Sequence, residues 1–161
     1  MIGHSLGGAI ALELAGRHAD LTSGIVRIDS IVFPPSNFMA SGEKMAETIS
    51  GPDFLAATRA QASEIYLDYV DIDDPARKAR LLGPIYDAQL KTPQHVAVST
   101  FINILNGYDA MPSAKACKVP LAYLSAAVPK IEQGRDLDRL QAACPQLIIA
   151  KTPWRRTFLA A

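Results

Sequence analysis

Five residues near the start of the chain carry the clearest chemical signal in the sequence. Gly3, His4, Ser5, Leu6 and Gly7 place a serine between two glycines, each two positions away. Small residues at those positions avoid collisions where a strand turns sharply into a helix and exposes a serine hydroxyl. The spacing therefore predicts that Ser5 is a nucleophile for acyl transfer. The alternative is a serine that only caps the following helix.

The elements around this serine have the composition that such a turn needs. Residues 6–18 are predicted to form a helix, and the small residues Gly8, Ala9 and Ala11 would let it lie close to a sheet. The positive end of the helix dipole would favour negative charge developing near Ser5. Only Met1 and Ile2 precede the motif as strand residues. We therefore expect the sequence to begin inside a fold.

Three later segments are typical of strands in a parallel sheet. Residues 24–33 are β-branched and nearly continuous, which predicts a strand covered on both faces. Residues 119–125 and 146–151 read as two further strands, with a helix over about 135–143 between them. Strands that alternate with helices in this way indicate an α/β fold with parallel connections.

A helical insertion of residues 36–113 separates the first two of these strands. One helix is predicted over about 53–69, and another between the breakers of 92–107. Asp74 can cap a helix that has Pro75 in its first turn, and Gly83 with Pro84 is predicted to interrupt it. The aromatic residues of the insertion are compatible with an apolar pocket or with simple packing: Phe54, Tyr66, Tyr86 and Phe101.

Residues 2–20, the strand at 24–30, the insertion and residues 117–125 together resemble the α/β-hydrolase superfamily in order and spacing. The resemblance covers nearly the whole chain, but only as the C-terminal part of that fold. It implies a partial α/β-hydrolase fold: a short, mostly parallel sheet with flanking helices and a helical cap at about 36–113. The chain 1–161 would then be one partial domain with an esterase-like serine hydrolase activity.

The resemblance also implies roles for individual residues. The backbone N–H of Leu6 would be one oxyanion donor, and the second would come from a loop between earlier strands. Asp29 occupies the place that some lipases of the superfamily use for the acid, although it could also be a polar strand end. Asp136 and Asp138 lie on a predicted helix, where solvated side chains are the simpler interpretation.

The general base is the largest gap in the predicted triad. The family order is serine, acid, histidine, yet no histidine follows His95. His4 is interpreted as structural, His18 lies about 20 Å along the helix from Ser5, and His95 is interpreted as a surface residue. The tail with Trp154, Arg155 and Arg156 suggests no role. We expect an incomplete triad and low activity.

The overall composition limits the partners. The 161 residues carry 16 Lys and Arg against 16 Asp and Glu, so neither nucleic acid nor an anionic membrane is indicated. The expected partner is a small, apolar, ester-like substrate, with no cofactor and no metal. Cys117 and Cys144 are interpreted as buried free thiols, which favours a cytoplasmic location.

Parts of the sequence suggest two other functions. A sheet that lacks its earlier strands would expose an edge, so the chain could be a non-catalytic interaction module or associate with itself. A glycine-rich turn before a helix can also hold phosphate. The sequence lacks G-x-G-x-x-G and has no lysine after the last glycine, which argues against nucleotide binding.

Overall fold

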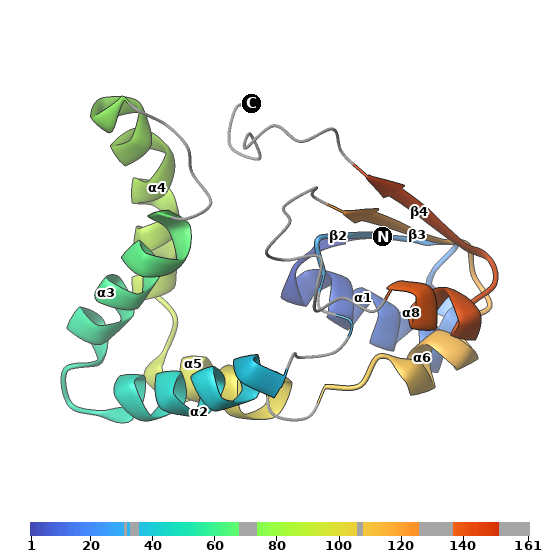
Figure 1. Cartoon of the computed structure of the whole chain (residues 1–161), viewed down its shortest axis with the longest axis horizontal. Coiled ribbons are helices and arrows are strands. Elements are labelled where there is room, and N and C mark those ends of the chain that lie inside the picture. The colour runs from blue at the N-terminus through green and yellow to red at the C-terminus, as the bar shows by residue number, and fades with distance from the viewer. Residues whose placement is uncertain (31, 33–35, 68–73, 106–107, 126–136, 152–161) are drawn as a thin grey trace. The chain divides into compact units, whose positions relative to one another are not determined.

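The computed structural model describes residues 1–30, 32, 36–67, 74–105, 108–125 and 137–151 (Figure 1). The chain divides into two compact units, one from Met1–Pro35 with Gly107–Trp154, the other from Ser36–Asn106 with Arg155–Ala161. We call these the sheet unit and the helical unit. The helical unit begins where the insertion was expected to begin, and its role as a cap stays a prediction.

The sheet unit is built on four parallel strands in the order of the sequence. They are β1 (Ile2–His4), β2 (Ile25–Ile28), β3 (Leu121–Ser125) and β4 (Leu147–Lys151), and each pairs with the next in parallel. The three predicted strands are confirmed, although β2 is shorter than residues 24–33. It ends at Ile28 because Asp29 adopts a φ of 48°, which is not an extended conformation.

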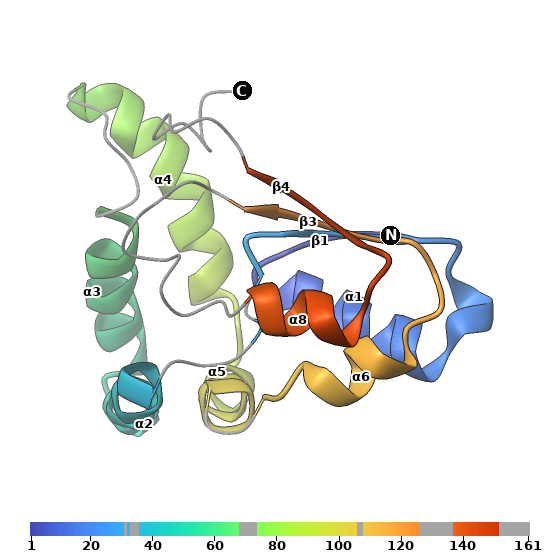
Figure 2. The same cartoon turned by 45° about the vertical axis from the view of Figure 1, so that its right-hand side comes forward.

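The described α-helices of the sheet unit lie on one side of the sheet. Figures 1 and 2 show α1 (Leu6–Arg17), α6 (Met111–Ala116) and α8 (Leu137–Ala143) together below the strands. A short 3₁₀ helix, η1 (Ala19–Leu21), follows α1. Between helices and sheet lies a core that includes Leu12, Leu121, Tyr123, Leu140 and Leu147. Residues of α1, β2, β3 and β4 contribute apolar side chains to this core.

The opposite face of the sheet is apolar and is not covered by these helices. Ile2, Val26, Ala122 and Ile148 are neighbours in register across the four strands. Ile2 is 71% exposed and Ile148 is 68% exposed. Side chains alternate along a strand, so the residues between them face the helices. Val26 of β2 is half-buried on this face, so the exposure is confined to the outer strands, and the coverage of β2 on both faces stays a prediction.

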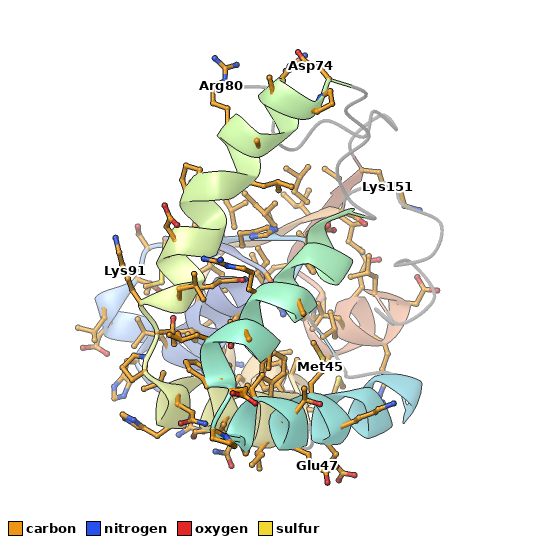
Figure 3. The ribbon with its side chains drawn as sticks, turned by 90° about the vertical axis from the view of Figure 1, so that its left-hand side faces the viewer. Met45, Glu47, Asp74, Arg80, Lys91 and Lys151 are labelled. Atoms are coloured by element: carbon orange, nitrogen blue, oxygen red, sulfur yellow. The ribbon has the colours of Figure 1, made fainter. Side chains whose placement is uncertain are left out.

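The helical unit contains the predicted helices. Its elements are α2 (Ser36–Ser50), α3 (Phe54–Leu67), α4 (Pro75–Leu90), α5 (Gln94–Thr100) and a π-helical turn, η2 (Phe101–Leu105). Asp74 caps α4 as expected, because its carboxylate accepts from the N–H groups of Ala76 (2.9 Å) and Arg77 (3.2 Å). Figure 3 shows Asp74 at the start of α4 and Lys91 at its end.

The predicted interruption of this helix is wrong. Pro84 lies inside α4, which continues to Leu90. A proline removes one backbone hydrogen bond and crowds the carbonyl four residues earlier, but the turns on both sides keep their own bonds. The cap at Asp74 and the length of α4 are enough to carry the helix through this local defect.

Cys117 and Cys144 are buried free thiols, as predicted. Burial and the neighbouring Cys117 raise the pKa of Cys144 to about 11. The unfolded thiol ionises at lower pH, so its contribution to stability is present below about pH 9 and is lost as the pH rises towards 11.

We therefore expect the free energy of unfolding to fall by on the order of 1 kcal/mol more in the wild type than in Cys144→Ala between pH 8.5 and 10.5. Urea unfolding at the two pH values measures this difference. Equal slopes in the two proteins would show that Cys144 does not titrate with a raised pKa.

Candidate active site

Ser5 lies where β1 turns into α1. Its φ is 50° and its ψ is −119°, a backbone conformation that side chains other than glycine rarely adopt. The turn is held on both sides: the Ser5 N–H donates to the carbonyl of Ile28 (2.9 Å), and the Ser5 carbonyl accepts from the N–H of Gly8 (3.1 Å). The serine is thus fixed at the carboxyl end of the sheet, with its hydroxyl beyond the strand.

Two glycines make this turn possible, and they are not quite the two that the motif suggests. A Cβ on Gly3 would lie 2.2 Å from the carbonyl oxygen of Gly7, and a Cβ on Gly8 would lie 2.6 Å from the Cβ of Ser30. A Cβ on Gly7 would meet nothing within 4 Å among the described residues. Steric relief by Gly3 is confirmed. The same role for Gly7 is wrong, because its side-chain direction is open, and Gly8 is the second crowded position.

Asp29 follows β2, the strand next to β1. Its φ is 48°, and its N–H donates to the carbonyl of Leu124 on β3 (2.9 Å). His4 and Ile28 are partners in register, so Ser5 and Asp29 follow neighbouring strands at the same edge of the sheet. Both of the residues predicted for catalysis therefore lie in left-handed turns at adjacent strand ends. Leu6 is the first residue of α1, where backbone N–H groups have no partner within the helix.

All three histidines of the sequence are exposed. His4 is exposed at the end of β1, although it was expected to pack as a structural residue. His18 is the C-terminal cap of α1, a helix of 12 residues that begins at Leu6. His95 is exposed in the first turn of α5, as its interpretation as a surface residue predicted.

The remaining candidates do not add to the site. Asp138 is exposed on α8, in agreement with a solvated role, and Asp136 lies outside the described residues. Among the aromatic residues of the helical unit, Phe54 is buried and Phe101 is half-buried. The side chains of Tyr66 and Tyr86 are outside the described part, as is the tail from residue 152. Within the described part of the chain, no three Cys, His, Asp or Glu side chains come together as a metal site.

The sequence did not predict a buried cluster next to Asp29, which consists of Arg27, Ser30 and Tyr123. Arg27 is fully buried in β2, and its Nη2 donates to the Oγ of Ser30 (2.9 Å). The guanidinium carbon lies 5.6 Å from the ring centroid of Tyr123 on β3, and the Tyr123 hydroxyl donates to the Ser30 carbonyl (2.5 Å). The sequence signal that could have predicted this cluster is Arg27 itself, a charged residue among the apolar residues of β2.

Burial changes the ionisation of this cluster. Desolvation lowers the pKa of Arg27, against the influence of two tyrosines that act in the other direction. Desolvation also raises the pKa of Tyr108 to about 12, and its hydroxyl lies 3.5 Å from the carbonyl oxygen of Ala9 on α1. Arg27 and the tyrosines therefore form a polar layer in the core between α1 and the strands.

The described helices include none that is long and apolar enough to cross a membrane. No protein-family model matches the chain. The curated lipase LipV of Mycobacterium tuberculosis is 29% identical over 85 residues, which are 50% of this chain and 30% of LipV.

Two solved structures are similar over most of this chain. The enol-lactonase from Burkholderia xenovorans LB400 has a TM-score of 0.69 at 19% identity, and a thermophilic esterase from Thermogutta terrifontis has a TM-score of 0.67 at 19% identity. Each match covers 94% of this chain but 55% of the solved chain. The chain therefore has part of the α/β-hydrolase fold, with a four-stranded parallel sheet and flanking helices.

Proposed function

We propose that this protein is an esterase-like serine hydrolase of the α/β-hydrolase type, with Ser5 as its nucleophile. One observation carries the proposal: the φ of 50° at Ser5, at a junction of strand and helix that Gly3 and Gly8 make sterically accessible. A helix-capping serine does not need this conformation, and no hydrogen bond from a capping side chain is formed at Ser5. A strained turn that exposes a hydroxyl is what an activated serine requires.

The proposed reaction assigns each residue a separate task. The Ser5 Oγ attacks the carbonyl carbon of an ester, a general base takes the hydroxyl proton, and the alcohol leaves with that proton. Water then hydrolyses the acyl group from Ser5. The N–H of Leu6, at the N-terminus of α1, would donate to the oxyanion, and Asp29 would orient the base.

The base itself is not assigned to a residue. His18 lies at the C-terminal end of α1, a helix of 12 residues that begins next to Ser5, and the sequence has no histidine after His95. A serine without a base reacts slowly at neutral pH, because most of the rate in such sites depends on the complete group of catalytic residues. The expected activity of this chain on a small, apolar ester is accordingly low.

Reaction with an alkyl fluorophosphonate probe tests the proposal. We expect slow labelling at Ser5, identified by peptide mass spectrometry, and loss of that label in Ser5→Ala. Ser99→Ala is the matched control, because Ser99 is exposed on α5 in the helical unit and should not change the labelling. Labelling that persists in Ser5→Ala, or wild-type protein that stays unlabelled, would contradict the proposed nucleophile.

A second candidate is a protein that binds through its sheet, and the uncovered apolar face favours it. We propose that the chain associates with itself through this face and the free edge of β1. Ile148→Lys is expected to weaken self-association by about tenfold, since a buried lysine would have to be desolvated.

Leu21→Lys is the matched control, because Leu21 is 66% exposed on η1 and not on the sheet. Sedimentation velocity over a range of concentrations measures the effect. A wild type that stays monomeric at every concentration, or two variants that weaken association equally, would refute this proposal.

A further inference from the structure

We propose that Arg27 and Tyr123 are positioning residues that hold Asp29 in its left-handed conformation beside Ser5, by fixing Ser30. The proposal deepens the function proposed above, because the use of Asp29 as the acid depends on that function. The juxtaposition of the residues does not depend on it.

Arg27 is an unusual residue for its place. A charged side chain in the middle of a strand must lose its hydration, and Arg27 is fully buried. Its known contacts in the cluster are the hydrogen bond to the Oγ of Ser30 and the approach to the ring of Tyr123. Apolar residues precede and follow it in β2. An apolar side chain at position 27 would fill the same space without the cost of desolvating a charge. A specific contact at the end of the strand explains why an arginine is useful here.

Tyr123 acts on the same residue through a different atom. Its hydroxyl reaches the backbone carbonyl of Ser30 from the neighbouring strand β3, whereas Arg27 reaches the Ser30 side chain. Both strands therefore hold Ser30, one through the main chain and one through the side chain. A residue held at two atoms has little freedom to rotate, so the preceding peptide group is fixed as well.

Ser30 also touches the helix that follows Ser5. A Cβ on Gly8 would lie 2.6 Å from the Ser30 Cβ and 2.7 Å from its Oγ, so Ser30 fills the space that this glycine leaves. On the other side of Asp29, the carbonyl of Ile28 accepts from the N–H of Ser5. Asp29 is thus held between one residue bonded to the Ser5 turn and another packed against α1.

The backbone at Asp29 needs such support. A non-glycine residue at positive φ is strained, and it keeps that conformation only where its surroundings enforce it. The N–H of Asp29 donates to Leu124, which fixes one side of the peptide. The contacts of Arg27 and Tyr123 with Ser30 supply the constraint on the other side.

Three single substitutions separate this role from general packing. Tyr123→Phe removes the hydroxyl that donates to the Ser30 carbonyl, and Ser30→Ala removes the Oγ that accepts from Arg27. Tyr108→Phe is the matched control, because it removes the hydroxyl of a second, partly buried tyrosine of the sheet unit, which donates to the Ala9 carbonyl rather than to Ser30. The sign of φ at Asp29 and at Ser5 is read by NMR from the HN–Hα coupling and the intraresidue NOE.

We expect the positive φ signature of Asp29 to be lost or averaged in Tyr123→Phe and in Ser30→Ala, and to persist in Tyr108→Phe. The signature of Ser5 should persist in all three variants. A positive φ at Asp29 that survives both Tyr123→Phe and Ser30→Ala would overturn the proposal. Equal loss in Tyr108→Phe would also overturn it, since the effect would then be general loosening.

Fluorophosphonate labelling of the same variants links the positioning to the proposed chemistry. We expect Tyr123→Phe to slow the maximal labelling rate of Ser5 by about tenfold with little change in the probe concentration needed for half of that rate. If wild-type Ser5 is not labelled, the proposed function fails while the NMR result still decides the positioning role. If labelling depends on Ser5 but the Asp29 signature does not change, only the positioning role fails.

Discussion

Gly3→Ala is expected to lower the free energy of unfolding of the sheet unit by about 3 kcal/mol or more. The added Cβ would lie 2.2 Å from the carbonyl oxygen of Gly7, 2.4 Å from its carbonyl carbon and 2.6 Å from the nitrogen of Gly8. All three atoms belong to the backbone, so no side chain can rotate away. Either β1 must move out of the sheet or the first turn of α1 must open, and both would disrupt the turn at Ser5.

Gly7→Ala is the matched control for this substitution. It adds the same methyl group four residues later, where nothing lies within 4 Å among the described residues, and Gly7 does not have a positive φ. Alanine is the better helix former, so Gly7→Ala should raise the free energy of unfolding by roughly 0.5 kcal/mol. Urea unfolding followed by circular dichroism compares the two. Similar losses in both variants would show that crowding at Gly3 does not limit the fold.

These glycines also show how far the sequence alone predicts the site. The motif around Ser5 predicted a strand-to-helix turn because few other local structures need a serine between small residues. The motif did not reveal which glycine is crowded, since that depends on Ser30, which lies 22 positions later than Gly8. The small residues after the motif did predict that α1 lies close to the sheet at Gly8, and the packing of Gly8 against Ser30 confirms it.

The elements themselves were predictable where the pattern was strong. Helix α1 and strands β3 and β4 begin and end within two residues of their expected bounds. The length of β2 was overestimated because the apolar run continues past Asp29 in the sequence, whereas the positive φ of Asp29 ends the strand. The buried Arg27 was missed for a similar reason: a charge in a strand normally indicates a solvent-facing position, and its partners are set by the sheet.

The likeness to esterases shows the fold, whereas the proposed chemistry depends on the backbone conformations of Ser5 and Asp29. The chain spans 55% of the enol-lactonase and of the thermophilic esterase that it resembles. The sheet face with Ile2 and Ile148 and the free edge of β1 are the surfaces against which further parts of such a fold could pack. The described residues of this chain form the turn at Ser5 and the hydrogen bonds that hold Ser30 next to Asp29.

Ser5→Gly is expected to raise the free energy of unfolding by about 1 kcal/mol, because the gain from relieved backbone strain, about 2 kcal/mol, exceeds the opposing effect on the unfolded chain. At a φ of 50° and a ψ of −119°, a serine has a strained backbone, whereas glycine adopts such angles freely. The greater freedom of glycine in the unfolded chain opposes this gain by roughly 0.5–1 kcal/mol, so relief of strain remains the larger effect. Under the proposed function, stability and chemistry are in conflict at this residue, because the substitution also removes the hydroxyl of the proposed nucleophile.

Ser5→Ala separates the two contributions. It removes the same hydroxyl but keeps a Cβ, so the strain remains and the free energy of unfolding should stay within about 0.5 kcal/mol of the wild type. Urea unfolding of the three proteins measures the difference, and both variants should lose the fluorophosphonate label. If Ser5→Gly and Ser5→Ala were equally stable, the turn would hold no strain. A serine would then occupy this position without the energetic conflict that marks a site kept for its chemistry rather than for its contribution to the fold.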